Sequence, residues 1–366
     1  MDSQALQNPP FWEGLRLQAH YFMSRVQLIC LSNYEGGMEK HVADLAAGLA
    51  RRGHVVGIIC GKGFSQHIIP EAEIFEVDAQ KSRINPGLLL TVFKTIRNFQ
   101  PDVIHCHGGK AALIIGLIPV NKDTTKVCTI HGLKSVNSAY NPFDLRIGVS
   151  KAITASVLTG GRKCITVYNG LDRTYSPADE SDFNIRECKL PPQFTWVAVG
   201  RLVKVKGFDL AIKALAQTNH NLIIAGAGPE REELENLTAN YHLKDRVKFL
   251  GHRSDIAKIY GEVDGTLITS VREGFSYVFL ESMIAGTPVI ATDVPVANEI
   301  LPERYICRNR SPETLAMVMK SFAKASVSEK AQCDEMLFCQ QELTLEKMIS
   351  KTEEAYLKAK EKLTNS

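Results

Sequence analysis

The stretch FTWVAVGRLVKVKGFDLAIKALAQTNHNLIIAGAG, residues 194–228, decides the fold class. It opens with an apolar run rich in aromatic and β-branched residues, continues at helical spacing over 207–217, and ends in a second strand-like run. A strand, a crossover helix and another strand form a βαβ unit, in which the two strands lie parallel. The segment therefore predicts an α/β fold with a parallel sheet.

The same alternation extends on both sides of this unit. Earlier strand-like runs are VQLICLSN, HVVGIIC, DVIHCH, KVCTIHG, LRIGVS and CITVYNG, with helical patterns at 38–52, 86–98 and 151–159. Later runs are RVKFLGH, DGTLITS and TPVIATD, with helical patterns at 229–242, 254–262 and 276–285, and a strongly helical stretch at 331–362. Residues 170–193 are polar, contain three prolines and lack a period, as a linker does. We expect two doubly wound halves.

Composition excludes several classes of protein. The chain has 366 residues, of which 45% are apolar and 23% charged, and its net charge is +3, too small to indicate nucleic acid. No run approaches the ~18 apolar residues of a membrane span, and no signal peptide is visible. The nine cysteines form no C-x-x-C pair and indicate reduced packing residues. These features predict a cytoplasmic protein of two domains.

Residues that follow the predicted strands are the candidates for ligand binding, because open parallel sheets bind ligands beyond the carboxyl ends of their strands. Gly36 and Gly37 follow the first strand and permit close backbone approach to an anion at a helix start, although an ordinary strand-to-helix turn has the same composition. Arg201 and Lys206 lie in GRLVKVKGFD, residues 200–209, which follows the first strand of the second half. They form either a phosphate clamp or solvated surface charge.

Two other motifs are weaker. GAGPERE begins as a dinucleotide fingerprint, but Arg231 stands where the third glycine is needed, so the turn only connects strand to helix. His105 and His107 share one face of a strand without a third ligand at metal spacing, which favours a satisfied pair of strand-end histidines. His131 comes just after a strand and before a glycine, a position that favours contact with a ligand.

REGFSYVFLESMIAGTPVIATD, residues 272–293, carries two glutamates, Glu273 and Glu281, in an otherwise apolar stretch. This stretch resembles the E-x7-E signature of retaining glycosyltransferases of family 4. Further similar motifs follow in the family's order: GGMEKHVADLAAGLARRGHVV, DVIHCH, TIHG, VSKAI, VYNGLD, GRLVKVKGFDLAIKA, LIIAGAGPEREEL and RVKFLGH. Together they cover residues 26 to about 310.

The resemblance implies the GT-B fold, in which two Rossmann-like domains enclose the active site in a cleft. We expect an N-terminal extension at 1–25, an acceptor-side domain at 26–175, a linker at 176–193 and a donor-side domain at 194–345. The last segment, 346–366, is expected to form a helix that crosses back to the first domain.

The resemblance also assigns roles to residues of this sequence. Glu281 is expected to bind the ribose hydroxyls of a nucleotide-sugar donor and Glu273 the hydroxyls of the transferred sugar, since a carboxylate accepts two adjacent hydroxyls. His131 matches the histidine that reaches the donor sugar. The amides from Gly274 to Tyr277 would face the diphosphate at a helix start. The complete donor-binding set is Gly36, Gly37, Arg201, Lys206, Glu273, Gly274, Phe275, Ser276, Tyr277 and Glu281, and the catalytic set is Glu273, His131, Arg201 and Lys206.

No metal and no other cofactor are expected. Glycosyltransferases of the other main fold hold a divalent ion with a D-x-D pair, and this chain contains no D-x-D. Arg201 and Lys206 would instead stabilise the charge that grows on the leaving diphosphate. No general base emerges from the sequence. In retaining enzymes of this type the acceptor is proposed to attack from the face of the leaving group, whose phosphate oxygen takes the proton.

The acceptor and the first 25 residues leave alternatives open. Members of this family commonly build bacterial surface polysaccharides, which makes a glycan or a lipid-linked acceptor the expectation. Phe11, Trp12, Leu15 and Phe22 lie at near-helical spacing, so this segment could contact the inner face of the plasma membrane, pack on the domain, or form an extension. A nucleotide-sugar 2-epimerase is the alternative activity. A third hypothesis, a nicotinamide oxidoreductase, is weakened because the dinucleotide-binding fingerprint GAGPERE lacks its third glycine.

Overall fold

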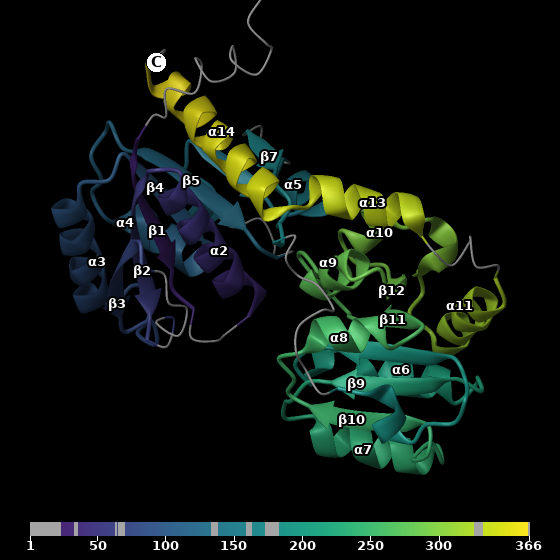
Figure 1. Cartoon of the computed structure of the whole chain (residues 1–366). Helices are drawn as coiled ribbons and strands as arrows, with labels where there is room; N and C mark the ends of the chain where they lie inside the picture. Colours follow the sequence, from purple (N-terminus) through teal and green to yellow (C-terminus); the bar gives the residue numbers. More distant parts are fainter. Residues whose placement is uncertain are drawn as a thin grey trace, which may run out of the picture.

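The structure, a computed structural model, describes residues 23–32, 36–62, 64, 70–132, 138–158, 163–172, 183–325 and 332–364. Figure 1 shows two domains, the first in purple to blue and the second in green, with the yellow C-terminal helices running from the second toward the first. The expected membrane-interface segment falls almost entirely in residues 1–22, outside the described residues. Within the described residues, no helix combines the length and the apolar character that crossing a membrane requires.

The first domain is built on a seven-stranded parallel sheet in the order β3-β2-β1-β4-β5-β6-β7. Its elements along the chain are β1 (Arg25–Cys30), α2 (Gly37–Arg51), β2 (Val55–Gly61), β3 (Ala72–Val77), α3 (Pro86–Phe99), β4 (Val103–His107), α4 (Gly108–Leu117), β5 (Thr125–Ile130), η2 (Ser138–Tyr140), β6 (Leu145–Gly148), α5 (Lys151–Leu158) and β7 (Cys164–Thr166).

The second domain has a six-stranded parallel sheet in the order β10-β9-β8-β11-β12-β13. Its elements are η3 (Ile185–Cys188), β8 (Thr195–Val199), η4 (Lys204–Lys206), α6 (Phe208–Leu215), β9 (Asn221–Ala225), α7 (Arg231–Asn240), β10 (Val247–Gly251), α8 (Ile256–Gly261), β11 (Gly265–Ile268), α9 (Tyr277–Ile284), β12 (Val289–Thr292), α10 (Ala297–Ile300), η5 (Glu303–Tyr305), β13 (Ile306–Cys307) and α11 (Pro312–Lys324). The helices α13 (Cys333–Glu342) and α14 (Leu345–Thr364) follow.

Both sheets are doubly wound. Chain order reverses between the neighbours β1 and β4 in the first sheet, and between β8 and β11 in the second. At such a point the connections leave in opposite directions and a crevice opens at the carboxyl ends of the strands. The loops after β1, β4, β8 and β11 are therefore where the fold positions a ligand site.

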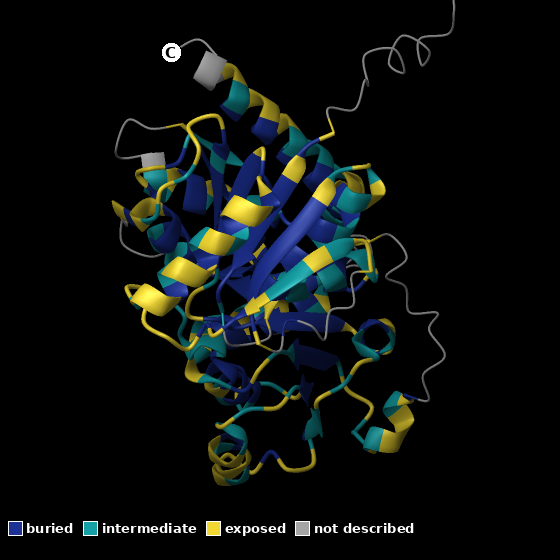
Figure 2. Cartoon of the chain, turned by 90° about the vertical axis from the view of Figure 1, so that its left-hand side faces the viewer, coloured by how far each residue is buried: buried dark blue, intermediate teal, exposed yellow. Residues whose placement is uncertain are grey.

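The strands are buried because helices cover both faces of each sheet, as parallel sheets require. In Figure 2 the central strands of the first domain are almost entirely buried, whereas the helices around them carry exposed outer faces. The five residues of β4 and the five of β9 are all buried. Burial on both faces explains why β9, NLIIA, is almost wholly apolar, whereas β4, VIHCH, buries two histidines among its apolar residues.

The last helix, α14, packs on the first domain. Ile349 and Tyr356 share a buried cluster with Leu45 and Leu49 of α2. A Cβ at Gly48 would lie 1.9 Å from Ile349 Cδ1, so a larger residue at this position would require the buried Ile349 side chain to shift.

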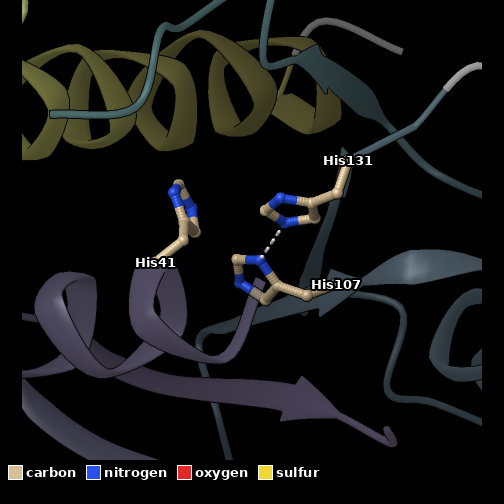
Figure 3. A group of neighbouring side chains, drawn as sticks. All are labelled: His41, His107 and His131. Atoms are coloured by element: carbon tan, nitrogen blue, oxygen red, sulfur yellow. Dashed lines mark hydrogen bonds between the residues drawn. The ribbon is translucent and has the colours of Figure 1, made fainter. Parts of the chain in front are cut away.

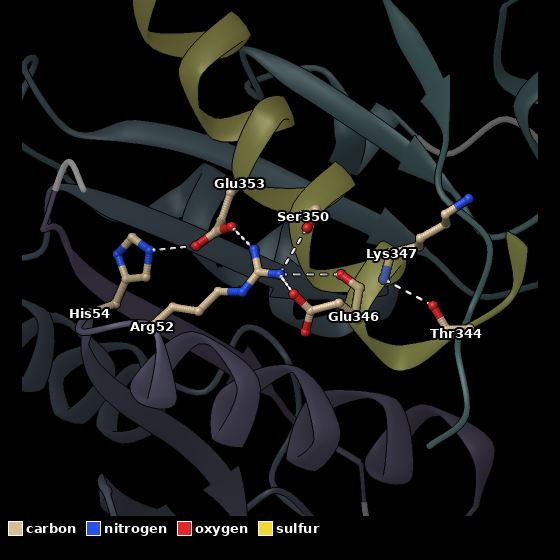
Figure 4. A network of polar contacts seen from close by, with 7 residues as sticks. All are labelled: Arg52, His54, Thr344, Glu346, Lys347, Ser350 and Glu353. Atoms are coloured by element: carbon tan, nitrogen blue, oxygen red, sulfur yellow. Dashed lines mark hydrogen bonds and ion pairs between the residues drawn. The ribbon is translucent and has the colours of Figure 1, made fainter. Parts of the chain in front are cut away.

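A polar network reinforces the contact between α2 and α14 (Figure 4). Arg52, which follows α2, forms ion pairs with Glu346 and Glu353 of α14 and donates to Ser350 Oγ at 2.8 Å. On the other side His54 Nε2 lies 2.9 Å from Glu353 Oε1. The guanidinium thus joins the end of α2 to two successive turns of α14.

Several elements differ from the sequence prediction. β3, α4, α10, α11 and β13 were not anticipated. The edge strand β3, AEIFEV, is only half-buried and lacks an apolar run, and α4, GGKAALIIGL, is apolar on nearly all sides and shows no helical period. α11 has a readable signal, since Ser311 caps it and Pro312 occupies its first turn.

Candidate active site

The second domain contributes a lysine and a glutamate that meet at the switch point of its sheet. Lys206 lies at the end of η4, in the loop after β8, and Glu273 lies in the loop between β11 and α9. The Lys206 ammonium donates to Glu273 Oε1 at 2.6 Å, and the Ser270 hydroxyl donates to the same oxygen at 2.7 Å. The Glu273 side chain is only 12% exposed, so the ion pair is well shielded from water.

Arg201 begins the same loop after β8 and is exposed. It follows Gly200, whose φ of +142° lies in a region that favours glycine. The structure thus joins Lys206 directly to Glu273, with Arg201 as an exposed residue of the same loop.

Four consecutive residues of the predicted donor-binding set form the start of α9: Gly274, Phe275, Ser276 and Tyr277. Ser276 is the N-cap, and its hydroxyl accepts from the Phe279 amide at 3.4 Å. Phe275 is buried, with its ring 5.6 Å from that of Tyr277. Because these side chains already cap and pack the helix, Phe275 and Ser276 can offer a ligand mainly their backbone groups.

The two domains meet at this helix start. A Cβ at Gly274 would lie 1.9 Å from the carbonyl oxygen of His131, so a side chain at this position would force the domains apart. A Cβ at Gly37, the first residue of α2, would lie 3.0 Å from the Tyr277 ring. Gly36, the N-cap of α2, is extended with φ −177°. The predicted residues of the first domain thus face the predicted loop of the second.

Glu281 lies on α9, one turn beyond Tyr277, and is half-buried. Burial raises its pKa, although the charges of Lys40 and Lys206 act in the opposite direction. Burial also raises the pKa of Tyr277 well above its ordinary value, with Asp44 and Glu281 adding to the shift. The Tyr277 hydroxyl is buried and finds no hydrogen-bond partner among the described residues. The Tyr277 side chain therefore presents a polar atom that the described part of the chain leaves unsatisfied.

Three histidines gather beside the domain junction (Figure 3). His41 comes from α2, His107 ends β4, and His131 follows β5. His107 Nδ1 lies 3.1 Å from His131 Nε2. Burial lowers the pKa of His41 to about 4 and places the pKa values of His107 and His131 well below 6.5. All three imidazoles are therefore neutral at pH 7.

The arrangement corrects the interpretation of HCH as a satisfied pair without a third ligand. His105 is satisfied, since its ring nitrogens contact the Tyr356 hydroxyl at 2.8 Å and Thr129 Oγ1 at 2.7 Å. His107 instead pairs with His131, and its Nε2 has no partner in the described part of the chain. No local spacing indicates this group, because its other members come from the loop after β5 and from α2.

Glu299 of α10 joins the domains at a second place. Its carboxylate accepts from the amides of Lys151 and Ala152, at 3.2 and 3.0 Å, and from the Tyr168 hydroxyl at 2.7 Å. An anion at the first turn of α5 is favoured by the helix dipole and by its unpaired amides. This contact holds the second domain against the first.

Sequence reasoning missed several of these side chains. Lys40 and His41 stand in the first turns of α2, inside the GGMEKH motif, and their one signal was their position directly after the glycines. The Lys40 ammonium lies 5.9 Å from the centre of the Tyr277 ring. Ser270 and Glu299 gave no signal, because only the packing of loops from separate strands brings them to the site.

Comparisons with known proteins agree with this arrangement. The family model described as Glycosyltransferase Family 4 matches residues 35–175, and the model described as Glycosyl transferases group 1 matches residues 183–335. The chain is 29% identical over 312 residues to an uncharacterized glycosyltransferase of Methanocaldococcus jannaschii, covering 73% of this chain and 79% of the relative.

Two further comparisons concern a bacterial relative and a solved structure. The lipopolysaccharide core biosynthesis glycosyltransferase LpsD of Rhizobium meliloti is 27% identical over 265 residues, covering 70% of this chain and 75% of the relative. The fold matches that of Anabaena HepE, crystallised with UDP, with a TM-score of 0.77 and 22% identity over 91% of this chain and all of that one. Two family models in the expected order, on two Rossmann-like domains, show that the chain belongs to the family 4 glycosyltransferases and has the GT-B fold.

Proposed function

We propose that this glycosyltransferase is a retaining, metal-independent hexosyltransferase that transfers a sugar from a nucleotide-diphosphate sugar to a glycan or lipid-linked acceptor. The observation that carries the proposal is the ion pair of Lys206 with Glu273 at the switch point of the second sheet, beside Gly274, which lies against the His131 carbonyl of the first domain. A cation and a carboxylate side by side suit a ligand whose phosphates adjoin a polyhydroxylated ring.

Each end of the donor would have its own set of groups. Glu281 accepts from the ribose hydroxyls, while Lys206, Arg201 and the amides at the start of α9 surround the diphosphate. Among the described residues, both hydrogen bonds to the Glu273 carboxylate fall on Oε1. Oε2 is then the atom that accepts from the hydroxyls of the transferred sugar. An ammonium has three protons, so Lys206 can keep its bond to Glu273 and still donate to phosphate.

The reaction breaks the bond between the sugar's anomeric carbon and the phosphate oxygen, and forms a bond from that carbon to the acceptor oxygen on the same face. The electron pair of the broken bond leaves with the diphosphate, whose oxygen takes the proton of the acceptor hydroxyl. Lys206 and Arg201 stabilise this developing charge more strongly than they stabilise the bound donor. His131, neutral through burial, donates or accepts at the sugar without adding charge.

The acceptor is proposed from relatives. LpsD acts in lipopolysaccharide core biosynthesis, which supports a role in assembling a bacterial surface polysaccharide at the cytoplasmic face of the membrane. Binding of the full chain to anionic vesicles, compared with a chain that lacks residues 1–22, tests whether the N-terminal segment contacts lipid. Equal sedimentation with vesicles would remove membrane contact from the proposal.

A panel of nucleotide sugars tests the activity. UDP-, GDP- and ADP-sugars are incubated with and without polysaccharide-precursor acceptors, and released nucleoside diphosphate is measured. We expect release that depends on the acceptor and a product whose anomeric configuration, read by NMR, equals that of the donor. An epimerised nucleotide sugar formed without acceptor would identify a 2-epimerase, and an inverted product would contradict retention.

A further inference from the structure

The cluster of His41, His107 and His131 has a geometry that the transfer reaction does not require. The three ring centres lie 5.3 Å apart for His41 and His107, 4.8 Å for His41 and His131, and 5.4 Å for His107 and His131. One ring nitrogen from each residue lies within 4.8 Å of the other two. Among the described residues this is the one such group of potential metal ligands.

These separations match three imidazoles around one tetrahedral metal. With zinc–nitrogen bonds of about 2.0 Å, ligand nitrogens lie about 3.3 Å apart and ring centres about 5 Å apart. His107 Nδ1 and His131 Nε2 are already 3.1 Å apart. We propose that His41, His107 and His131 form a binding site for a divalent transition metal of the zinc type.

Hydrogen bonding within the protein leaves part of the cluster unsatisfied. His41 Nδ1 is buried and has no hydrogen-bond partner among the described residues, and His107 Nδ1 contacts His131, another member of the cluster. A buried polar atom without a partner costs free energy, so such atoms mark a place where another group binds. The neighbouring His105 provides the contrast, because both its ring nitrogens have partners.

The chemistry of the donors selects the metal. Neutral imidazoles suit zinc, copper and nickel, whereas magnesium and calcium prefer oxygen ligands. His41 and His107 are 2% and 1% exposed, while His131 is half-exposed beside Gly274. A metal bound by all three would therefore keep its open coordination position on the side of the domain junction.

Occupancy of this site would oppose catalysis, an inference that rests on the proposed function. A ring nitrogen of His131 that is bound to metal is withdrawn from the donor sugar. The metal would accordingly inhibit transfer, so independence from added metal and sensitivity to zinc are expected together.

Metal binding is tested on the nucleotide-free full chain, with any histidine tag removed. Zinc is titrated by calorimetry, and cobalt by its visible absorption, into the wild type and the H41Q and H107Q variants. We expect a single site with the intense absorption of tetrahedral cobalt, and affinity at least about tenfold weaker in each folded variant, since even indirect support of a ligand is worth that much. H252Q, which removes an exposed histidine, is the matched control and should bind like the wild type. Affinity unchanged in H41Q and H107Q would overturn the site.

A measurement on the wild type alone guards against variants that fail to fold. X-ray absorption at the zinc edge should report about three imidazole nitrogens at about 2.0 Å. Sulfur in the first shell would place the metal at a cysteine, such as the exposed Cys333, and would overturn the proposal.

The activity measurement separates this inference from the proposed function. Micromolar zinc should reduce turnover of the wild type, and H41Q, measured against its own zinc-free rate, should resist. Zinc bound by the three histidines without inhibition would leave the metal site standing and contradict the role of His131 at the donor.

Discussion

At the scale of single residues, Lys206 is the side chain with the most sharply defined role. K206A and R201A should each lower turnover by about 10²-fold or more, because the two cations act on charge that develops in the transition state. Steady-state kinetics with the identified donor is the measurement. K204A removes an exposed lysine from the same loop and should retain normal turnover. Near-normal turnover in either test variant would remove that residue from the diphosphate site.

Substitutions of Glu273 and Glu281 should have different effects, because the two residues are assigned to different parts of the donor. Glu281 is assigned to the ribose, which is present in donor and product alike, so E281A should weaken binding of the free nucleoside diphosphate. Glu273 is assigned to the sugar, so E273A should cut turnover and leave diphosphate binding nearly unchanged. A hydrogen bond to a charged group contributes ~1.5 to 3 kcal/mol, which predicts changes of about tenfold or more.

Calorimetric titration with the diphosphate distinguishes these outcomes, and E262A, an exposed glutamate of the same domain, serves as the control. Equal loss of affinity in the E281A and E273A variants, or loss in E273A alone, would reverse the two assignments or make the pair structural.

Residues that stand in a recognisable motif could be predicted from the sequence, and those that contribute only through packing could not. The E-x7-E stretch and the loop after β8 carried Glu273 and Lys206, and the structure joins them at 2.6 Å. Ser270 shares Glu273 with Lys206, but an isolated serine in a loop has no distinguishing pattern. His41 depends on the approach of α2 to β4 and β5, which no local spacing reports.

At the scale of elements, α14 depends on the network around Arg52. R52A removes the cation shared by Glu346 and Glu353, and leaves the mostly buried Glu353 with His54 alone. We expect the free energy of unfolding to fall by about 1 to 3 kcal/mol, the cost of breaking a partly buried charged contact. Urea denaturation measures it. R51A, an exposed arginine in the last turn of α2, should change stability by less than about 0.5 kcal/mol. If R52A and R51A changed the free energy of unfolding equally, the Arg52 network would not be what stabilises the packing of α14.

The elements that sequence patterns predicted well are those with strong periods. α2, α3, α5 and the central strands fall within a few residues of their expected bounds. α4 was missed because it is apolar on nearly all sides and shows no polar face, and β3 because an edge strand is half-exposed and carries glutamates. In both cases the environment, set by neighbouring elements, decides the pattern.

At the scale of the whole molecule, the proposed transfer reaction should not depend on a metal ion. We propose that Lys206 and Arg201 supply the positive charge that a divalent ion supplies elsewhere, so saturating EDTA should leave the transfer rate unchanged. The assay compares the rate before and after chelation, in buffer free of zinc. Activity that chelation abolishes and manganese restores would contradict the role of the two cations.

The stability of the molecule should depend on pH through its buried histidines. Burial lowers the pKa of His41 to about 4 and of His105 to about 3, and lowers those of His107 and His131 well below their ordinary value of 6.5. Below pH 6.5 the unfolded chain therefore binds protons that the native protein does not. The stabilisation is fully present above pH 6.5 and is lost as the pH falls toward 4, with a slope of up to about 1.4 kcal/mol per pH unit for each histidine.

Glu281 acts in the opposite sense, because burial raises its pKa and its neutral form is favoured in the native protein at low pH. Burial also lowers the pKa of His220. One carboxyl group, whose shift Lys40 and Lys206 oppose, cannot offset these buried imidazoles. Urea midpoints at pH 7.5, 6.5, 5.5 and 5, measured with a chelator present, should therefore fall steadily below pH 6.5. H41Q should show a shallower slope, since one of these proton acceptors is gone. A urea midpoint that stays constant from pH 6.5 to 5 would mean that the histidine cluster is already protonated in the native protein. The neutral imidazoles that the sugar contact and the metal site both require would then be absent.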